Sequence, residues 1–508
     1  MADDASEGML RGGRLLIAGF ALAVANFMVV LDTTIANVSV PHISGSLGIA
    51  GSQGTWVITS YAVAEAICVP LTGWLTNRFG SVRVFFFSTA GFAIFSLLCG
   101  LSGSLAMLVV CRIGQGFCGG PIMPLTQTLM LRIFPPKSRA QASGLWAMTT
   151  VVGPVLGPVL GGLISDNWSW NWIFFINLPV AALCLTATWK LLRNVETATR
   201  KLPIDTVGLA LLVVWIGALQ VMLDLGRDHD WFADGFIVKL GLVAVIGFAA
   251  FLAWELTQPN PIVDLRVFRH RGFTVSVISL SVSFAVFFSV TVLVPQILQN
   301  NFRYTATWAG YASAPLGIAA IILSPVVAML TTKVDSRALV CFGIVWMGMT
   351  CWMRSRWNTD ADFWTLALPQ LVQGVGIPFF FVPVTAIALA AVDPAETAGA
   401  AGLMNFLRTM SGAIATSLIT SMTDDQTRIA RTELVGTLNS GPTVAALSAD
   451  GSPLDQARAM IDTVVDGQAA MLASNHIFLL SAVLMAGSAL VIWGAPRPRR
   501  TIEPGSAH

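Results

Sequence analysis

Fourteen apolar stretches, each about as long as a bilayer is thick, constrain the fold of this chain more than any other feature. A membrane-spanning helix needs about 20 mostly apolar residues, and it satisfies its own backbone hydrogen bonds where lipid offers no partners. Charged residues make up 11% of the 508 residues, whereas soluble globular proteins carry about 25%. The sequence therefore predicts an all-α integral membrane protein with 14 transmembrane helices. The expected spans are residues 15–38, 54–76, 84–102, 105–129, 139–164, 170–191, 204–224, 236–256, 272–298, 307–331, 338–354, 361–390, 397–421 and 473–494.

The distribution of Lys and Arg predicts the orientation of the chain. Cytoplasmic loops of membrane proteins carry an excess of basic residues. With the N-terminus inside, the inner loops hold more than twice as many Lys and Arg residues as the outer loops. In this count Arg354 belongs to an outer loop, whereas Arg112 and Arg408 fall within spans. Both termini are therefore expected in the cytoplasm.

Other patterns speak against an enzyme or a nucleic-acid-binding protein. The net charge is +2, and the basic residues are scattered among short loops. The seven cysteines lie in or near apolar runs, and no Cys or His residues have metal-ligand spacing. The sequence contains no GxxxxGK[ST] phosphate loop and no pattern of a nucleophile with its base. We therefore expect no cofactor, no metal and no ATP-driven reaction.

The two ends of the chain repeat each other at an offset of about 255 residues. The matches occur in the same order along both copies: Val40-Pro41 with Val294-Pro295, Gln115-Gly116 with Gln373-Gly374, and Gly144-Leu145 with Gly402-Leu403. The offset spans eight of the expected helices. It predicts two parallel six-helix repeats, separated by two inserted helices, with a substrate site between them near the membrane midplane.

This repeat divides the chain into three parts. Residues 1–201 form the expected N-terminal six-helix bundle, residues 202–260 the two inserted helices, and residues 261–508 the C-terminal six-helix bundle. A polar stretch at 422–472 is expected to be a periplasmic loop between the last two spans. Its second half, from Leu454, has apolar residues at near-helical spacing. This spacing indicates either a surface helix on the bilayer rim or a docking site for a periplasmic partner.

The apolar segment Gly144–Gly162 carries several glycines and two prolines. Such residues destabilise helices in water, but they are tolerated in lipid because neighbouring helices and side chains satisfy the freed backbone groups. Gly153, Gly157 and Gly161 recur every four residues and form a smooth stripe that another helix can approach closely. The prolines, including Pro158, bend the same helix. A bent helix with a bare face is what a moving gate needs.

Several segments resemble motifs of the major facilitator superfamily, in particular of its fourteen-helix drug:proton antiporters of the EmrB type. Gly144–Gly162 is similar to the helix 5 antiporter motif, and Gly73–Val84 resembles the helix 2–3 loop motif. Leu31–Pro41 and Leu108–Gly116 look like the motifs of helices 1 and 4. The loop motif usually has Asp where this chain has Asn77, which weakens any charge-based lock there. The expected gating residues are Gly144, Gly153, Gly157, Pro158, Gly161, Gly162, Gly73, Arg78 and Gly80.

The resemblance implies a major facilitator fold and a proton-driven exporter of hydrophobic or amphipathic toxic compounds that works by alternating access. It places the protein in the bacterial inner membrane and implies assembly with a periplasmic adaptor protein and an outer-membrane channel. A symporter or a dedicated metabolite exporter of the same fold is the alternative. The helix 5 motif speaks against symport.

Four charged residues are clear cases of charges inside the expected spans, where a lone charge costs about 3 kcal/mol on insertion scales. Asp32 in helix 1 and Arg112 in helix 4 lie at similar depth, because Asp32 is about 27 Å from the inner end and Arg112 about 10 Å from the outer surface. We predict that they interact directly or through water. Glu65 in helix 2 and Arg408 in helix 13 each lie about 16 Å deep. Since these helices face each other across the halves, we predict a second contact there that bridges the halves in one conformation and breaks in another.

Proton coupling requires a carboxyl group whose affinity for a proton changes with its surroundings. Burial favours the protonated form, and a nearby arginine favours the charged form. Asp32 and Glu65 are therefore the candidate proton carriers, with Arg112 and Arg408 as their partners. The alternative is that Asp32 and Arg112 form a permanent structural pair.

Polar and aromatic residues in the spans are candidates for the central substrate cavity. Amide side chains at these depths either line the cavity or form hydrogen bonds between helices. A phenylalanine either offers an apolar wall to a flat substrate or faces lipid. The candidate cavity residues are Gln115, Gln127, Gln373, Asn405 and Phe380.

Overall fold

The structure is a computed structural model that describes residues 10, 12–135, 138–200, 203–227, 229–393, 396–437 and 454–497. Within these ranges all regular secondary structure is helical. Twelve of the described helices are long and apolar enough to cross a membrane, and the bent helix α7 (Arg139–Asn167) brings the number to thirteen. The remaining expected span is the first half of α17 (Thr397–Thr437), which is long enough but more polar. The prediction of an all-α integral membrane protein is confirmed.

The helices follow one another in two similar series. The first series consists of α1 (Gly13–Leu47), α3 (Trp56–Phe79), α4 (Ser81–Gly100), α5 (Leu105–Gly119) with α6 (Ile122–Ile133), α7, and α8 (Trp172–Phe175) with α9 (Asn177–Ala187). Next come α10 (Thr206–Leu225) and α11 (Gly235–Thr257). The second series consists of α12 (Arg271–Asn300), α13 (Ala306–Ser313) with α14 (Pro315–Leu330), α15 (Ser336–Arg354), α16 (Phe363–Ala390), α17 and α19 (Leu454–Ser488).

The two series pack in the same way, which confirms the predicted repeat. In the first series α1 packs on α7 and α3 packs on α5, and in the second α12 packs on α17 and α14 packs on α16. A Cβ atom added at Gly116 would lie 2.9 Å from the Cβ of Ala64. One added at Gly374 would lie 2.9 Å from the Cβ of Ala319, its counterpart. The bare face of each glycine therefore allows the same close helix crossing in both copies.

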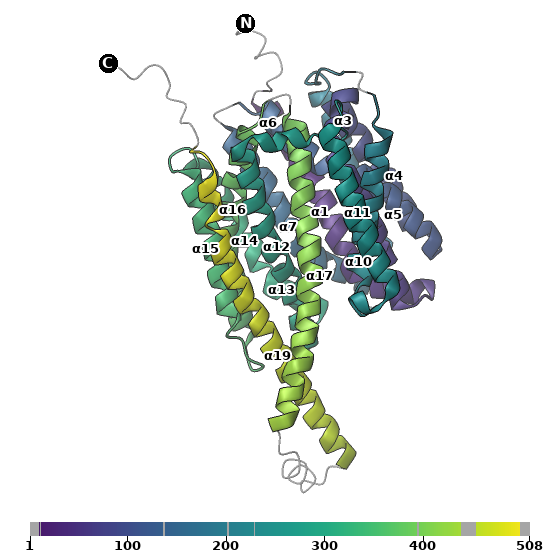
Figure 1. The fold of residues 1–508 in the computed structure, drawn as a ribbon, viewed down its shortest axis with the longest axis vertical. Helices are drawn as coiled ribbons and strands as arrows, with labels where there is room; N and C mark the ends of the chain where they lie inside the picture. Colours follow the sequence, from purple (N-terminus) through teal and green to yellow (C-terminus); the bar gives the residue numbers. More distant parts are fainter. Residues whose placement is uncertain are drawn as a thin grey trace, which may run out of the picture.

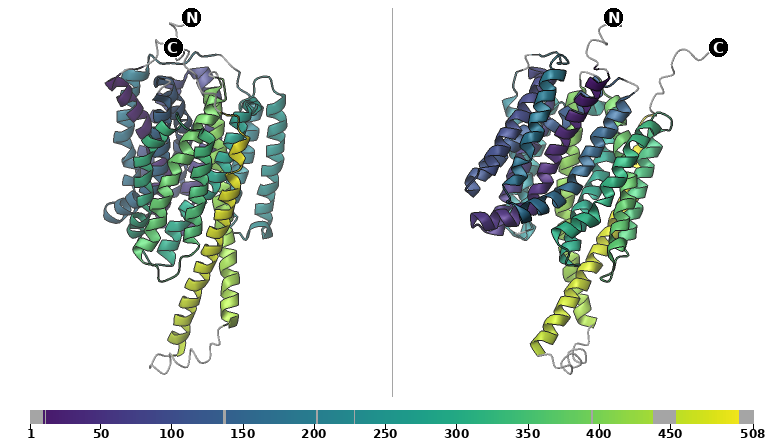
Figure 2. Two further views of the ribbon diagram at one scale, coloured as in Figure 1. Left: turned by 90° about the vertical axis from the view of Figure 1, so that its left-hand side faces the viewer. Right: turned by 180° about the vertical axis from the view of Figure 1, so that it is seen from behind.

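The two series meet along a seam, in which α7 packs on α14, and α3 and α6 pack on α17 (Figure 1). The pair α10 and α11 stands at one edge of the bundle and contacts the seam through α10, which packs on α3 and α17 (Figure 2). A buried Trp215 in α10 lies against Phe406 of α17, with ring centroids 6.0 Å apart. The division into parts at residues 201 and 260 remains a prediction.

The stretch at 422–472 differs from the expected loop. α17 continues to Thr437, and α19 already begins at Leu454, so both helices project beyond the bundle as a hairpin (Figure 1). Arg431 of α17 pairs with Asp462 and Asp466 of α19, at 3.1 and 2.6 Å. The predicted surface helix on the bilayer rim is therefore wrong, because α19 runs without a break from Leu454 into the last span.

The glycine stripe of α7 lies against α1, which agrees with the close helix approach predicted from the spacing of the glycines. A Cβ atom at Gly161 would lie 2.9 Å from the carbonyl oxygen of Ile35. α7 also bends by 46° between residues 141–154 and 159–167, in agreement with its prolines. Gly162 is buried, whereas the side chain of Pro158 lies outside the described part. At the start of the helix, Gly144 faces α14 across the seam, where a Cβ atom would be 3.3 Å from the carbonyl oxygen of Ser324.

The loop motif between α3 and α4 also touches the seam. A Cβ atom at Gly73 would lie 2.7 Å from the Cα of Gly399 in α17, so only glycine allows this crossing. Gly80 has φ of 93°, a conformation that residues with a side chain rarely adopt. The guanidinium of Arg78 lies over the ring of Trp74, 5.8 Å from its centroid. The motif thus forms a tight turn at one end of the seam.

The sequence analysis missed the residue that caps α4 beside this turn. The carboxylate of Glu196 accepts hydrogen bonds from the backbone N–H groups of Val82 (2.9 Å) and Arg83 (3.0 Å). Carboxylates stabilise helix N-termini because they satisfy free N–H groups and interact with the helix dipole. Asn77 does not take part in this cap, and its backbone oxygen accepts a hydrogen bond from the N–H of Arg200 at 2.7 Å.

Candidate functional site

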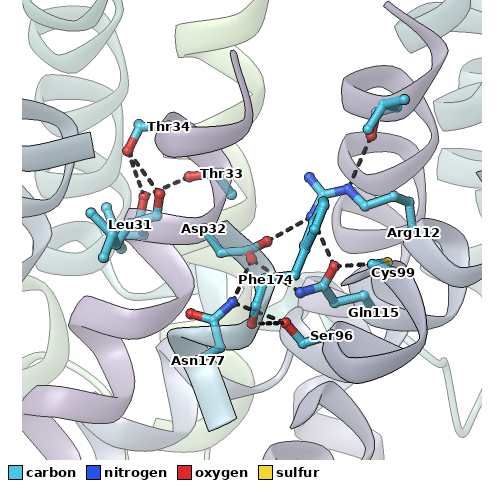
Figure 3. A network of polar contacts seen from close by, with 12 residues as sticks. Leu31, Asp32, Thr33, Thr34, Ser96, Cys99, Arg112, Gln115, Phe174 and Asn177 are labelled. Atoms are coloured by element: carbon cyan, nitrogen blue, oxygen red, sulfur yellow. Dashed lines mark hydrogen bonds and ion pairs between the residues drawn. The ribbon is translucent and has the colours of Figure 1, made fainter. Parts of the chain in front are cut away.

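Asp32 lies at the centre of a buried polar network in the first series (Figure 3). Its Oδ2 accepts a hydrogen bond from Nη1 of Arg112 at 2.7 Å. Its Oδ1 accepts hydrogen bonds from Nδ2 of Asn177 (2.7 Å) and Nε2 of Gln115 (3.1 Å). The predicted contact between Asp32 and Arg112 is therefore confirmed. Asn177 begins α9 and was not singled out in the sequence.

Arg112 has a backbone acceptor, a side-chain amide acceptor and an aromatic ring around its guanidinium, in addition to Asp32. Its Nε donates to the backbone oxygen of Val57 at 3.0 Å, and Nη1 also donates to Oε1 of Gln115 at 2.8 Å. The ring of Tyr61 lies 4.2 Å from the guanidinium carbon. Both Asp32 and Arg112 are 1% exposed. Removing one partner of such a buried pair costs about 3–5 kcal/mol, because the other charge stays buried and uncompensated.

The network is linked to the bent helix. Thr34 lies two residues after Asp32 in α1, and its hydroxyl donates to the backbone oxygen of Gly153 in α7 at 3.2 Å. The hydroxyl is also within hydrogen-bond distance of the backbone oxygens of Val30 and Leu31. A shift of α7 along its glycine stripe therefore moves the segment of α1 that carries Asp32.

A second buried network lies at the corresponding place in the other series, around Arg354. Nη2 of Arg354 donates to Oε1 of Gln373 (2.6 Å) and of Gln370 (2.9 Å). At the offset of 258 that relates Gln115 to Gln373, Arg354 corresponds to Ser96 and Gln370 corresponds to Arg112. Arg354, counted with the outer side of the membrane, is the last residue of α15, as the expected span 338–354 has it, but its side chain is buried and 0% exposed. Its position at the edge of an apolar run hid it from the sequence analysis.

The Arg354 network differs from the Asp32 network in charge. In the described ranges no carboxylate oxygen lies within 4.0 Å of Arg354. Nε of Arg354 and Nε2 of Gln373 are buried and have no hydrogen-bond partner among the described atoms. Each series therefore contains a buried arginine that is hydrogen-bonded to a glutamine. Among the residues that the structure describes, only the network of the first series also contains a buried acid.

Arg408 lies in the seam and does not contact Glu65 in this conformation. No N–O contact between the two side chains falls within 4.0 Å, so the predicted bridge between the halves stays a prediction for another conformation. Instead, Nη2 of Arg408 donates to Sδ of Met123 at 2.7 Å. The guanidinium lies 5.6 Å from the ring of Trp146 and 5.1 Å from the ring of Phe284. In this conformation Arg408 therefore contacts a thioether and two aromatic rings rather than Glu65.

The candidate cavity residues take three different positions. Nδ2 of Asn405 donates to Oε1 of Gln127 at 3.1 Å, which joins α17 to α6 across the seam. Gln115 and Gln373 belong to the two buried arginine networks. Phe380 is 0% exposed, so it is a core residue rather than a cavity wall in this conformation. Of the five residues, only Gln127 and Asn405 contact each other between the two series.

One cluster has the residue types of a metal site. Ligand atoms of His270, Asp393 and Glu396 lie within 4.8 Å of one another at the end of the seam. Nη2 of Arg269 lies 2.7 Å from Oε1 of Glu396 and 3.6 Å from Oδ2 of Asp393. The guanidinium thus occupies the position that a cation would take, and the cluster is better described as an ion-pair network.

Comparison with known proteins places this geometry in context. The sequence profile described as "Major Facilitator Superfamily" matches residues 22–416. The "Multidrug export protein EmrB" of Escherichia coli (strain K12) is 44% identical over 496 residues, which cover 96% of this chain and 97% of that protein. The "Fatty acid resistance protein FarB" of Neisseria gonorrhoeae is also 44% identical over 496 residues, with the same coverage.

The solved structures support the same fold. A structure of the major facilitator proton:xylose symporter XylE aligns with a TM-score of 0.61 over 95% of this chain and 96% of that chain. The two sequences are only 13% identical, so this similarity shows the fold alone.

Proposed function

Because the chain belongs to the Major Facilitator Superfamily, we propose that it is a proton-driven antiporter that exports hydrophobic or amphipathic toxic compounds. Substrates enter a site between the two series from the cytoplasm or the inner leaflet, and protons return inward. The relatives that are named for multidrug export and fatty acid resistance match the chain over nearly its whole length, which supports this class of activity.

The observation that carries the proposal is the buried Asp32 network. Three side chains donate hydrogen bonds to the two carboxylate oxygens of Asp32 in this conformation. In the proposed cycle this network opens and closes, Asp32 is the proton carrier, and Thr34 connects its part of α1 to α7. Arg112 stabilises the charged state, and Glu65 and Arg408 in the seam serve as a second, subsidiary pair. The gating glycines allow α7 and α17 to slide against their neighbours.

A vesicle experiment tests the direction of coupling. Purified protein is reconstituted into vesicles with an acidic lumen that contains a pH-sensitive dye. Addition of ethidium or another lipophilic drug to the bath is expected to make the lumen more alkaline, because antiport moves protons out as the drug enters. A symporter of the same fold would acidify the lumen further. If none of the drugs tested changed the pH of the lumen, the result would contradict multidrug antiport.

The proposal also includes location and partners. The protein lies in the bacterial inner membrane with both termini in the cytoplasm, and the hairpin of α17 and α19 extends into the periplasm. The hairpin is stiffened by Arg431, and its apolar Ile429, Met460 and Val464 are more than half exposed. Exposed apolar side chains on a projecting element are typical of interaction sites. We assign this hairpin as the contact for a periplasmic adaptor protein that leads to an outer-membrane channel.

A charged substitution on the hairpin tests the adaptor contact independently of transport. Val464→Glu places a carboxylate among the exposed apolar residues, whereas Thr463→Glu places it at the exposed neighbouring position. We expect Val464→Glu to abolish drug resistance in a host without other pumps but to keep full drug-dependent proton movement in vesicles. Thr463→Glu should leave both unchanged. Full resistance of the Val464→Glu strain would refute the assignment.

A further inference from the structure

Arg408 is a buried positive charge in the seam, and no carboxylate of the described residues pairs with it. It is 2% exposed and lies in the part of α17 that packs on α6 and α3. Its Nε has no acceptor among the described atoms, and its Nη2 contacts only the weakly accepting thioether of Met123. A buried charge without a counter-charge is unfavourable and marks a functional site in a membrane protein.

The surroundings of Arg408 have the character of a ligand site. The rings of Trp146 and Phe284 lie on either side of the seam, from α7 and α12, and both face the guanidinium. The indole N–H of Trp146 is already satisfied by Thr126, so the ring offers an apolar face. A charged anchor between aromatic surfaces is typical of sites that bind amphipathic small molecules. The missing group is therefore an acceptor of two hydrogen bonds attached to an apolar body.

We propose that Arg408 binds the carboxylate of amphipathic organic anions, whose apolar part lies between Trp146 and Phe284. This inference rests on the proposed function and specifies a substrate class for it. A carboxylate matches the fork of donors on a guanidinium and forms two charge-assisted hydrogen bonds with it. The name of the fatty acid resistance protein of Neisseria gonorrhoeae, 44% identical to this chain, refers to compounds with this chemistry.

Glu65 gives the site a means of release. It lies in α3, which packs on α17 across the seam, and it does not touch Arg408 in this conformation. When α3 and α17 move relative to each other, the carboxylate of Glu65 can take the place of the substrate carboxylate on Arg408. Substrate and Glu65 then compete for the same guanidinium, so that each transport state satisfies the charge with a different acid.

Two pairs of probes that differ only in charge test the proposal with the full chain in lipid nanodiscs. The first pair is 2-naphthoate and its neutral amide, and the second is decanoate and decanamide. We expect the unmodified protein to bind each carboxylate at least tenfold more tightly than its amide. Arg408→Gln should remove this preference, and Arg408→Lys should retain most of it. Arg354→Gln, at a buried arginine outside the seam, should keep the full preference.

Met123→Glu provides an independent arm that leaves Arg408 in place. The new carboxylate lies where the thioether now contacts Nη2, so it should occupy Arg408 internally and abolish the preference for carboxylates in a protein that still folds. Equal binding of carboxylate and amide by the unmodified protein, or an unchanged preference in Arg408→Gln or Met123→Glu, would overturn the proposal. Proton movement driven by ethidium is measured with the unmodified protein alone, and its absence there would count against the proposed antiport rather than against this site.

Discussion

Asp32→Asn is expected to abolish proton-coupled transport while the protein still reaches the membrane. The carboxylate uses both oxygens, because Oδ2 accepts from Arg112 and Oδ1 accepts from Gln115 and Asn177. An amide has a single oxygen, so its NH₂ group must face one of these donors, and Arg112 loses its counter-charge. Breaking a buried pair of this kind costs about 3–5 kcal/mol. The drug-dependent rate of proton movement should fall by at least about tenfold, since 1.4 kcal/mol corresponds to a factor of ten.

The measurement is the alkalinisation of the lumen in the vesicle assay, together with the thermal midpoint of the purified protein. Asp360→Asn, the same chemical change in the exposed loop between α15 and α16, is the matched control and should behave as the unmodified protein. A strongly destabilised Asp32→Asn protein with normal coupling per folded molecule would instead support the reading that Asp32 and Arg112 form a permanent structural pair.

Gly157→Leu is expected to have a similarly large effect through packing. A Cβ atom at this position would meet the side chain of Thr34 and come within 3.1 Å of the backbone nitrogen of Ile35. Inserting carbon atoms into a filled interface costs about 1–3 kcal/mol or more, and here the neighbour is backbone that cannot move away. We expect a lower thermal midpoint and the loss of drug resistance, because α7 can no longer lie against α1.

Gly217→Leu is the matched control for this substitution. Gly217 lies inside the spanning helix α10, and no atom lies within 4 Å of a Cβ placed there. The same change should therefore leave the midpoint and resistance unaltered. A normal midpoint and full resistance for Gly157→Leu would show that the two helices do not need this close approach.

The membrane fold and the internal repeat could be predicted from the sequence because both leave periodic signals. Apolar runs of bilayer length mark spans directly, and equal offsets between distant glycines mark equivalent crossings. The pair of Asp32 and Arg112 was predictable for a similar reason, since two lone opposite charges at one depth in a bilayer favour contact. Depth alone does not fix the direction of a side chain around its helix, so the sequence could not say in which conformation Glu65 and Arg408 meet, and in this one Arg408 contacts Met123 instead.

The features that sequence reasoning missed are those that depend on polar residues in long helices. Arg354 sits at the end of α15, where hydropathy cannot separate a buried terminal residue from a loop. The hairpin is polar, so its composition resembles that of an irregular loop, although α17 and α19 stabilise each other through Arg431 and its two acidic partners. Glu196 acts through a backbone terminus far away in sequence, and no local pattern records that contact.

The continuity of α17 has a mechanical consequence. Its first part lies in the seam against α3 and α6, and its last part stands in the hairpin as one unbroken helix from Thr397 to Thr437. The 16 residues beyond residue 421 extend for about 24 Å. A tilt of about 10° at the seam therefore displaces the tip by about 4 Å. α17 therefore transmits a tilt of the bundle to the tip of the hairpin, and a protein bound at the tip moves with each change of conformation.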